Sequence, residues 1–558
     1  MPVICKYCRT PNQEGSALCS LCGSRLPYTP APTPVTPPPA QTPPPASTTP
    51  TVPTPTPTPT PPNQTSNTAN LRFTLFQTEA WDEKWPAAVA SAENQDKKAG
   101  IILTNTRGCN GSLRNELWMN LTEYMNFKST DGVEYYVLDL ANQAVKKTYT
   151  GEIESLIDLI TDIYNVEKPE YIMILGDFKT VPNIVWENRS NDSDKVVFSD
   201  LPFITLSTDS PFNDIHYEVK SLIKVGRIPT SAASGFKEAF IYLKNTKNST
   251  LTVDDLKAFF LSAEGWEISS REIGQPVSAD MHFSPSNGSF EFKGSLDNYN
   301  VLMFNLHGSN GTHLWYGEDK SKNVAPAFNA SKLPKNRNFI LFTEACYGAR
   351  PFNGGINTES MVSTALRNGC CAFVGSTQIA WGGRGGMSCA DILSQQFTKN
   401  IVAGYSAGES FNAALPHVER NRWNDCSLKT IIEFALYGDP SYTPIGSSNK
   451  GVTQVKKKAF SKNNLAYRVV DGEEQKAVSV KAAYVEENVE CVLKAFVEES
   501  HPDLMDVKPR FFMDDCTGDY QAIYNKTAKN EEVCKLVKVF FDSNGSVKDQ
   551  YVSKYVNV

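Results

Sequence analysis

The sequence predicts an α/β protein in which a mostly parallel sheet carries helices on both faces. Short β-branched runs at 100–104, 134–140 and 171–175 are separated by stretches with helical spacing of apolar residues. Two later runs, 301–306 and 338–343, are almost continuously apolar. Strand and helix in alternation build parallel sheets, and strands covered on both faces are apolar throughout.

The helical stretches are defined by their periodicity. Leu113, Leu117, Leu121 and Tyr124 fall on one helical face, and a similar apolar face runs through 153–164. A further helix is expected at 358–368, where Gly369 ends it, and the strand 371–374 follows. Beyond 450 the rhythm is lost. Residues 478–480, 483–485 and 491–497 are predicted as closely spaced strands of a small β-rich or mixed module.

Length and composition divide the 558-residue chain, which is too long for one ordinary core. The predicted regions are a metal-binding segment (1–28), a Pro/Thr-rich linker (29–70), an N-terminal α/β subdomain (71–230), a catalytic subdomain (231–447) and a C-terminal module of unknown role (448–558). The linker prediction is based on residues 27–62, of which 17 of 36 are proline, a composition typical of an extended, disordered spacer.

The first segment has the spacing of a zinc site. Cys5 and Cys8 form one Cys-x-x-Cys pair, Cys19 and Cys22 form another, and a glycine follows. Two such pairs supply four thiolates for tetrahedral Zn²⁺, whose binding would provide the folding energy of so short a segment. It resembles the zinc-ribbon modules of many prokaryotic proteins. Four unrelated thiols, or a redox pair, are the alternatives.

The net charge, the apolar runs and the cysteines of the chain limit which partners and which location are expected. The net charge of −7 gives no reason to expect nucleic acid as a partner. No signal peptide and no apolar run of about 18 residues is visible, so no membrane span is expected. The 13 cysteines fit a reducing compartment better than a disulfide framework, which favours the cytoplasm.

Two of the most apolar strands are followed by reactive side chains. His307 follows the strand at 301–306 and Cys346 follows the strand at 338–343. One crossover fits in the interval between them, so the strands can be neighbours with adjacent tips. A thiol and an imidazole placed in this way can act as nucleophile and base, and the backbone N–H groups of Gly308 and Cys346 are candidate oxyanion donors. The alternative is a buried, inert cysteine beside a structural histidine.

The two tips also carry a family resemblance. A strand ending in His-Gly, followed by a strand ending in Glu-Ala-Cys-x-Gly, resembles the caspase-like cysteine peptidases, and within them the gingipain family. Further matching segments occur in order: 175–177 (LGD), 207–209 (STD), 225–229 (VGRIP), 307–315 (HGSNGTHLW), 375–378 (GSTQ) with Trp381, and 437–441 (YGDPS). The resemblance covers about 100–445 and implies the three-layer caspase-like fold.

The resemblance also implies a substrate pocket. Asp209 and Trp381 match the positions that, in the arginine-specific members, bind and line the P1 cation. A carboxylate pairs well with a guanidinium, so a basic P1 residue is expected, Arg before Lys. Asp209 serving only as a turn cap is the alternative. For a third catalytic carboxylate, Asp177 and Glu187 are both candidates.

The sequence therefore predicts an intracellular cysteine endopeptidase that cleaves a specific protein substrate through a Cys–His dyad and an acyl-enzyme, in a pathway such as bacterial signalling or defence. The zinc ribbon would recruit an activator or substrate. The alternative is a catalytically silent adaptor that binds proteins through the ribbon and the C-terminal module. The acidic loop 191–194 could bind Ca²⁺, although such loops usually meet solvent.

Overall fold

A computed structural model describes residues 3–4, 11–12, 97–142, 145, 149–214, 217–246, 256–310, 314–335, 337–350, 360–384, 386–421, 425–444, 480–482, 485, 487–514, 520–527 and 534–553. Nearly all of the zinc segment and all of the linker predicted at 29–70 lie outside these residues. The four predicted zinc ligands are among those outside: Cys5, Cys8, Cys19 and Cys22.

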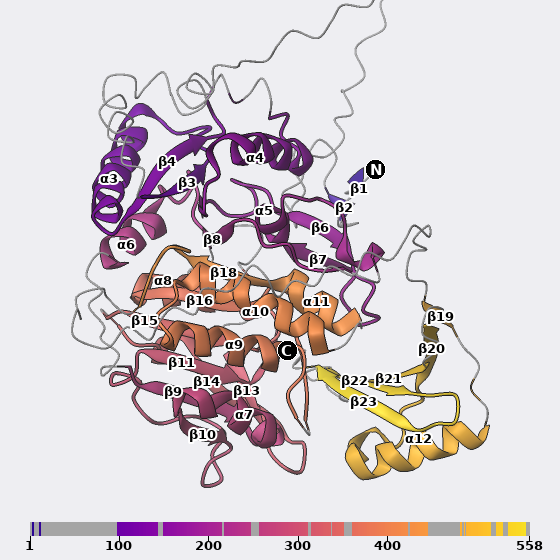
Figure 1. Cartoon of the computed structure of the whole chain (residues 1–558). Coiled ribbons are helices and arrows are strands. Elements are labelled where there is room, and N and C mark those ends of the chain that lie inside the picture. The colour runs from indigo at the N-terminus through magenta and orange to yellow at the C-terminus, as the bar shows by residue number, and fades with distance from the viewer. Residues whose placement is uncertain are drawn as a thin grey trace, which may run out of the picture.

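One ten-stranded sheet forms the centre of the molecule (Figure 1), with the spatial order β10-β9-β11-β15-β16-β18-β8-β5-β3-β4. The strands are β3 (Lys98–Thr104), β4 (Val133–Asp139), β5 (Tyr171–Leu175), β8 (Lys224–Ile228), β9 (Ala258–Ala263), β10 (Asp280–Ser284), β11 (Val301–Asn305), β15 (Phe339–Thr343), β16 (Cys370–Ser376) and β18 (Phe434–Gly438). Every strand predicted between 100 and 374 is present, which confirms the α/β class.

The sheet is mostly parallel, as predicted. The pairing of β16 with β18 is antiparallel, and every other neighbouring pair is parallel. The sheet therefore has two halves that run in opposite directions. Because β18 comes from the predicted catalytic subdomain and pairs with β8 of the predicted N-terminal subdomain, the two subdomains share one sheet.

Helices cover both faces of the sheet and complete three layers (Figure 1). On one face α3, α6 and α8 contact one another in succession, and on the other α7, α9, α10 and α11 do so, while α4 packs against α5. Their bounds are α3 (Gly111–Thr130), α4 (Ile153–Glu167), α5 (Leu201–Thr205), α6 (Lys237–Thr246), α7 (Glu267–Gly274), α8 (Met361–Asn368), α9 (Ala390–Val402), α10 (Ala407–Asn421) and α11 (Asp425–Glu433).

Local sequence explains why these elements form. All residues of β5, β11 and β15 are buried, as expected for apolar strands covered on both faces. At the start of α3, the Asn110 side chain accepts a hydrogen bond from the Leu113 backbone N–H at 2.9 Å. At the end of α8, Gly369 has the left-handed φ of 110° that a C-cap requires.

Several motifs of the family resemblance form the architecture rather than the chemistry. Arg227 is fully buried, and its guanidinium donates to both oxygens of Asp200 at 2.7 and 2.6 Å and to the Gly176 carbonyl at 2.8 Å. A Cβ on Gly226 would lie 2.3 Å from the Gly438 carbonyl oxygen. The 175–177, 225–229 and 437–441 motifs therefore meet in one buried region where β5, β8 and β18 come together.

Smaller sheets surround the main one. They are β1 (Val3–Ile4) with β2 (Pro11–Asn12), β6 (Ile184–Glu187) with β7 (Val196–Ser199), and β12 (His307–Gly308) with β13 (Leu314–Glu318) and β14 (Val324–Asn329). Short 3-10 helices occur at Pro211–Asn213, Glu264–Trp266, Gln275–Val277, Ala330–Lys332 and Pro502–Leu504.

The C-terminal module is a mixed α/β unit beside the half of the main sheet that runs from β10 to β16 (Figure 1). Its strands pair in the order β17-β23-β22-β21-β20-β19, and β17 comes from the segment predicted as the catalytic subdomain. The bounds are β17 (Trp381–Gly382), β19 (Val480–Ala482), α12 (Glu487–Ser500), β20 (Arg510–Asp514), β21 (Tyr520–Thr527), β22 (Cys534–Phe541) and β23 (Val547–Ser553).

The strand predicted at 491–497 was wrong, because this segment lies within helix α12. Val489, Leu493 and Val497 are 5%, 0% and 2% exposed, whereas Val492 is 50% exposed. Apolar residues four positions apart on one buried face define a helix, and the short β-branched run concealed that period.

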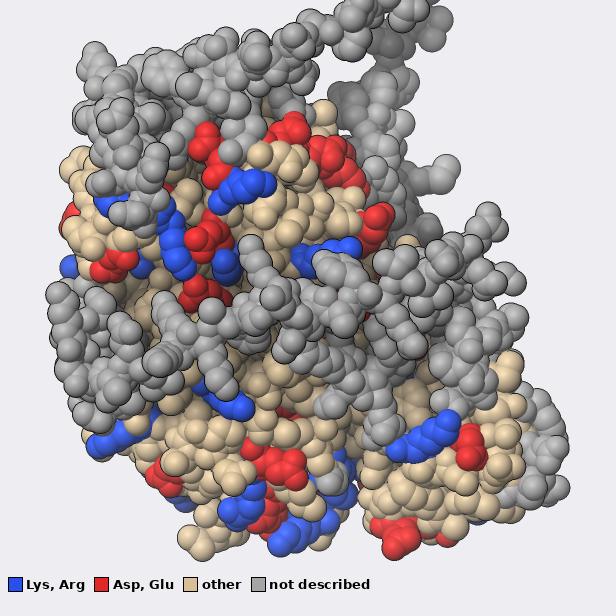
Figure 2. Space-filling model, viewed as in Figure 1, with Lys and Arg blue, Asp and Glu red and all other residues tan. Residues whose placement is uncertain are grey.

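The outer surface of the described residues carries charges of both signs. Figure 2 shows Lys and Arg interspersed with Asp and Glu on the visible face. Among the described residues, no helix has the length and apolar character needed to cross a membrane.

Candidate active site

The sheet brings His307 and Cys346 to neighbouring strand ends. β11 pairs with β15 in parallel, with Phe304 opposite Thr343, and the imidazole and the thiol each follow three residues later. The next residue, Gly308, packs against the Cys346 backbone, where an added Cβ would lie 2.0 Å from the carbonyl oxygen and 2.8 Å from the nitrogen. The prediction that these two strands are neighbours is confirmed.

The Cys346 thiol is enclosed, with 1% of the residue exposed. Its sulfur accepts a hydrogen bond from the Ala380 backbone N–H at 3.2 Å. Tyr347, the next residue, has a left-handed φ of 55° and donates its backbone N–H to the Gln378 carbonyl at 2.8 Å. Burial raises the pKa of the thiol well above its usual value, which the Ala380 N–H offsets only in part. The resting cysteine is therefore protonated.

The His307 ring is held from two sides. Its Nε2 lies 2.8 Å from Glu318 Oε2, and its ring centroid lies 4.4 Å from that of Trp266. Nδ1 is buried and has no hydrogen-bond partner among the described groups. Burial lowers the pKa of the imidazole, and the hydrogen bond to Glu318 raises it only partly. The neutral ring therefore donates from Nε2 and keeps a free lone pair on Nδ1, where a base can act.

Glu318 is the carboxylate that orients the histidine, and it was not among the residues predicted from the sequence. Its side chain is 3% exposed and also contacts Arg384. Burial raises its pKa, but Arg384 and then His307 more than offset that effect, so the pKa is well below its usual value. Of the two carboxylates considered from sequence, Asp177 instead accepts from the Thr180 N–H at 2.7 Å, and Glu187 is exposed.

The missing signal was the register of a hairpin. β12 pairs with β13 so that His307 faces Tyr316, and Glu318 lies two residues further on the same face. A diagonal neighbour at this position is within side-chain reach. Sequence periodicity did not reveal this two-residue strand, so nothing in the sequence singled out this glutamate.

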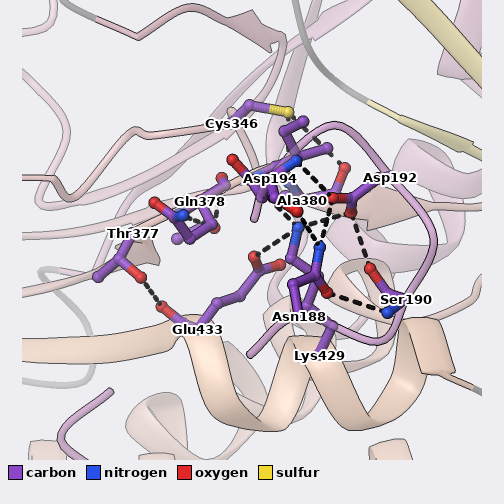
Figure 3. A network of polar contacts seen from close by, with 12 residues as sticks. Asn188, Ser190, Asp192, Asp194, Cys346, Thr377, Gln378, Ala380, Lys429 and Glu433 are labelled. Carbon is purple, nitrogen blue, oxygen red and sulfur yellow. Dashed lines mark hydrogen bonds and ion pairs between the residues drawn. The ribbon is translucent and has the colours of Figure 1, made fainter. Parts of the chain in front are cut away.

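A buried ionic network lies behind the cysteine (Figure 3). Lys429 Nζ lies 2.6 Å from Asp192 Oδ2 and 2.7 Å from Asp194 Oδ2, and we call these two aspartates the acidic pair. Glu433 lies 3.7 Å from the same ammonium. Burial raises the pKa of Glu433 well above its usual value, which keeps it protonated. Among the described ion pairs, the acidic pair is in contact with one cation, Lys429.

The network positions the loop that contacts the sulfur. Asp194 accepts from the Ile379 N–H at 2.8 Å and from the Tyr347 hydroxyl at 2.6 Å. Asp192 accepts from the Trp381 indole N–H at 3.1 Å. The side chains of the acidic pair are 0% and 6% exposed, and these two carboxylates, which belong to the loop 191–194, bind Lys429.

The two predicted substrate-pocket residues have different surroundings. Trp381 is fully buried and directly follows Ala380, so it belongs to the wall around the thiol. Asp209 is exposed and its backbone N–H is bound by the Ser207 hydroxyl at 3.2 Å, as in a turn. The charged neighbours that act on the pKa of the Cys346 thiol are Lys429, which lowers it, and Asp194, which raises it.

Comparison with known proteins gives structural matches only. No protein-family profile matches the chain, and no curated protein matches it in sequence. The chain is similar to a crystal structure of the Arg-specific cysteine proteinase gingipain R, with a TM-score of 0.45 and 10% identity over 82% of this chain and 97% of that one.

Two further matches are similar in extent. A complex of RgpB pro- and mature domains from Porphyromonas gingivalis gives a TM-score of 0.43 and 11% identity over 81% of this chain and 98% of that one. A structure described as a protease gives a TM-score of 0.43 and 10% identity over 83% of this chain and 100% of that one.

Proposed function

We propose that the protein is a cysteine endopeptidase in which Cys346 is the nucleophile and His307 is the acid–base group. The observation that supports this most is the state of His307. Its Nε2 is held by Glu318 while its Nδ1 is buried without a partner, next to a glycine that packs on the Cys346 backbone. A buried nitrogen left free in this way loses hydrogen-bond energy unless it serves a reacting group.

The reaction follows from these positions. The thiol proton passes to His307 Nδ1, the thiolate attacks the peptide carbonyl carbon, and a tetrahedral oxyanion forms. Nδ1–H then protonates the leaving amine, and the C–N bond breaks to give a thioester. Water hydrolyses the thioester with the same histidine as base. The backbone N–H groups of Gly308 and Cys346 remain the proposed oxyanion donors, each worth about 2.7–4 kcal/mol in such sites.

The proposed substrate is a protein cleaved after Arg or Lys. Trp381 in the wall around the thiol supports this, because an indole face attracts a cation. Asp209 remains the residue predicted to bind the P1 cation, and the D209A variant should then lose activity on Arg substrates. Full activity of that variant on Arg substrates would rule out Asp209 as the residue that binds the P1 cation.

The experiment is turnover of fluorogenic peptides that differ only at P1, with wild type and the Cys346→Ala variant compared. Cleavage after Arg or Lys that is abolished in the variant is the expected result. Cleavage that persists in the variant would refute the assignment of the nucleophile.

A silent adaptor is the second candidate, and the near-complete burial of Cys346 and His307 favours it. A peptide-based electrophile separates the two functions. Covalent labelling of Cys346 supports the peptidase. An unlabelled Cys346, together with a zinc-dependent pull-down of a partner protein, supports the adaptor.

We further propose that Cys5, Cys8, Cys19 and Cys22 bind a structural Zn²⁺ and that this ribbon recruits an activator or substrate in the cytoplasm. The spacing of the four thiols supports the metal, and the scatter of the other nine cysteines along the sequence fits a reducing compartment better than a disulfide framework. Metal analysis of the purified chain, with and without the four cysteines, tests the site.

A further inference from the structure

The C-terminal module is joined directly to the wall of the proposed active site. Trp381 and Gly382 form the edge strand β17, which pairs with Ser553 and Val552 of β23. Trp381 directly follows Ala380, whose backbone N–H binds the Cys346 sulfur. The wall around the thiol is therefore the first strand of the module's own sheet.

One lysine of the module reaches into this wall. Lys538, on β22, is fully buried, and its Nζ lies 5.1 Å from the centroid of the Trp381 ring. Its ammonium also donates to the Ser190 backbone carbonyl. A buried ammonium over an indole with an oxygen acceptor has the partners that a bound cationic side chain would use.

The charges around this lysine explain why it is there. Among the described ion pairs, the acidic pair has a single buried cation in contact, Lys429. Lys538 supplies a second positive charge. Burial raises the pKa of Asp192, but Lys429 and, to a smaller extent, Lys538 more than offset that effect. Two buried carboxylates that share one cation are costly, so a second cation at this place is stabilising. A cation from the substrate would serve the same purpose.

A second lysine on the same strand faces the other half of the site. Lys535 lies 2.8 Å from Asp503, and its charge reaches Glu318 and His307. Strand β22 therefore contributes charge both to the wall around the thiol and to the carboxylate that holds the histidine. With this strand in place, Cys346, His307 and Trp381 are 1%, 3% and 0% exposed.

We propose that the C-terminal module is an internal inhibitor, in which Lys538 occupies a cation-binding subsite formed by Trp381, the Ser190 carbonyl and Asp192. A basic side chain of a protein substrate takes this subsite only after β22 has moved away. This inference rests on the proposed peptidase function and adds a regulatory role for residues 480–553. A module needed for catalysis, rather than opposed to it, would give the opposite response to loss of Lys538.

The test uses the full chain with Lys538→Met, which keeps the apolar stem and removes the charge. Lys494→Met is the matched control, because Lys494 is an exposed lysine of the same module. Two rates are measured: alkylation of Cys346 by iodoacetamide, followed on its peptide by mass spectrometry, and turnover of an Arg peptide. We expect Lys538→Met to raise both rates by about tenfold or more, the effect of losing one charge-assisted hydrogen bond, and Lys494→Met to match wild type.

Alkylation of Cys371, a fully buried cysteine in β16, reports on general loosening. The proposal is overturned if Lys538→Met alkylates Cys346 no faster than wild type, or if Cys371 is accelerated equally. Faster labelling of Cys346 in Lys538→Met than in wild type, without peptide cleavage by either protein, supports the inhibitor and contradicts the peptidase function. Peptide cleavage by wild type, together with unchanged labelling of Cys346 in the variant, supports the peptidase and overturns the inhibitor.

A second variant locks the module in place in case Lys538→Met does not fold. Gly382 and Val552 are cross-strand partners, and antiparallel partners lie about 4.5–5.5 Å apart between Cα atoms, within disulfide range. The oxidised Gly382→Cys/Val552→Cys protein should turn over peptide at least about tenfold more slowly than the same protein after reduction and removal of the reductant. Equal rates in the two states would overturn the proposal.

Discussion

Replacement of Glu318 by Gln tests the assigned role of this carboxylate most directly. The change keeps the shape and removes the negative charge that faces His307 Nε2 at 2.8 Å. Arg384 has only N–H donors to offer, so it keeps the oxygen of the new amide and turns the NH₂ group toward the histidine. Nε2 must then accept a hydrogen bond, and the ring proton moves to Nδ1. The nitrogen that should take the thiol proton is thereby blocked.

The size of the effect follows from two contributions. Loss of a charge-assisted hydrogen bond costs about 1.5–3 kcal/mol. Loss of the correct tautomer in a comparable triad lowers kcat by about 10⁴-fold. We therefore expect kcat/KM to fall by about 10²- to 10⁴-fold in Glu318→Gln. The control is Glu264→Gln, because Glu264 pairs with Lys320 at 3.2 Å outside the dyad contacts. The assay is peptide turnover, with thermal unfolding measured in parallel. Retention of more than half of the activity by a folded Glu318→Gln protein would refute the assigned role.

Three further predictions concern packing and charge. Lys429→Met leaves the acidic pair without its buried partner, so urea denaturation should show a loss of about 3–5 kcal/mol, against no measurable loss for the exposed Lys399→Met. Gly308→Ala should lower turnover by about 10²-fold, because its Cβ would lie 2.0 Å from the Cys346 carbonyl oxygen and must displace the backbone; wild-type turnover would show that the tip tolerates movement. Burial, then Lys535, lowers the pKa of His501 from 6.5 to about 4, so the unfolded chain binds the proton first as pH falls. Stability that is complete above pH 6.5 should therefore decline by up to about 3 kcal/mol toward pH 4, as measured by urea denaturation, and a His501→Gln protein with the same decline would contradict this.

The strands could be predicted where composition and period agreed. The runs that became β5, β11 and β15 are apolar throughout and lie in doubly covered positions, so their length and location were visible in the residues. The segment 491–497 failed because its β-branched residues favour a strand locally, while burial of one helical face in the module decided the outcome. Tertiary packing overrode local propensity there.

The same division applies to the site. His307 and Cys346 were predictable because parallel strands place their carboxyl ends at one edge, and neighbouring strands bring two such ends together. Glu318 was not predictable, because its contact depends on the register of β12 with β13. The ionic network was not predictable either, since Asp192 and Lys429 are 237 residues apart in the chain.

By itself, the sequence determined the alternation of strands and helices, the two reactive strand ends and the four-cysteine spacing, because each depends on residues close together in the chain. Only the tertiary structure decided which carboxylate holds the histidine, which cation pairs with the acidic pair, and that Lys538 lies against the wall of the dyad. Those contacts join segments far apart in sequence. Their energies depend on burial and distance, which arise only when the sheet and the module have come together.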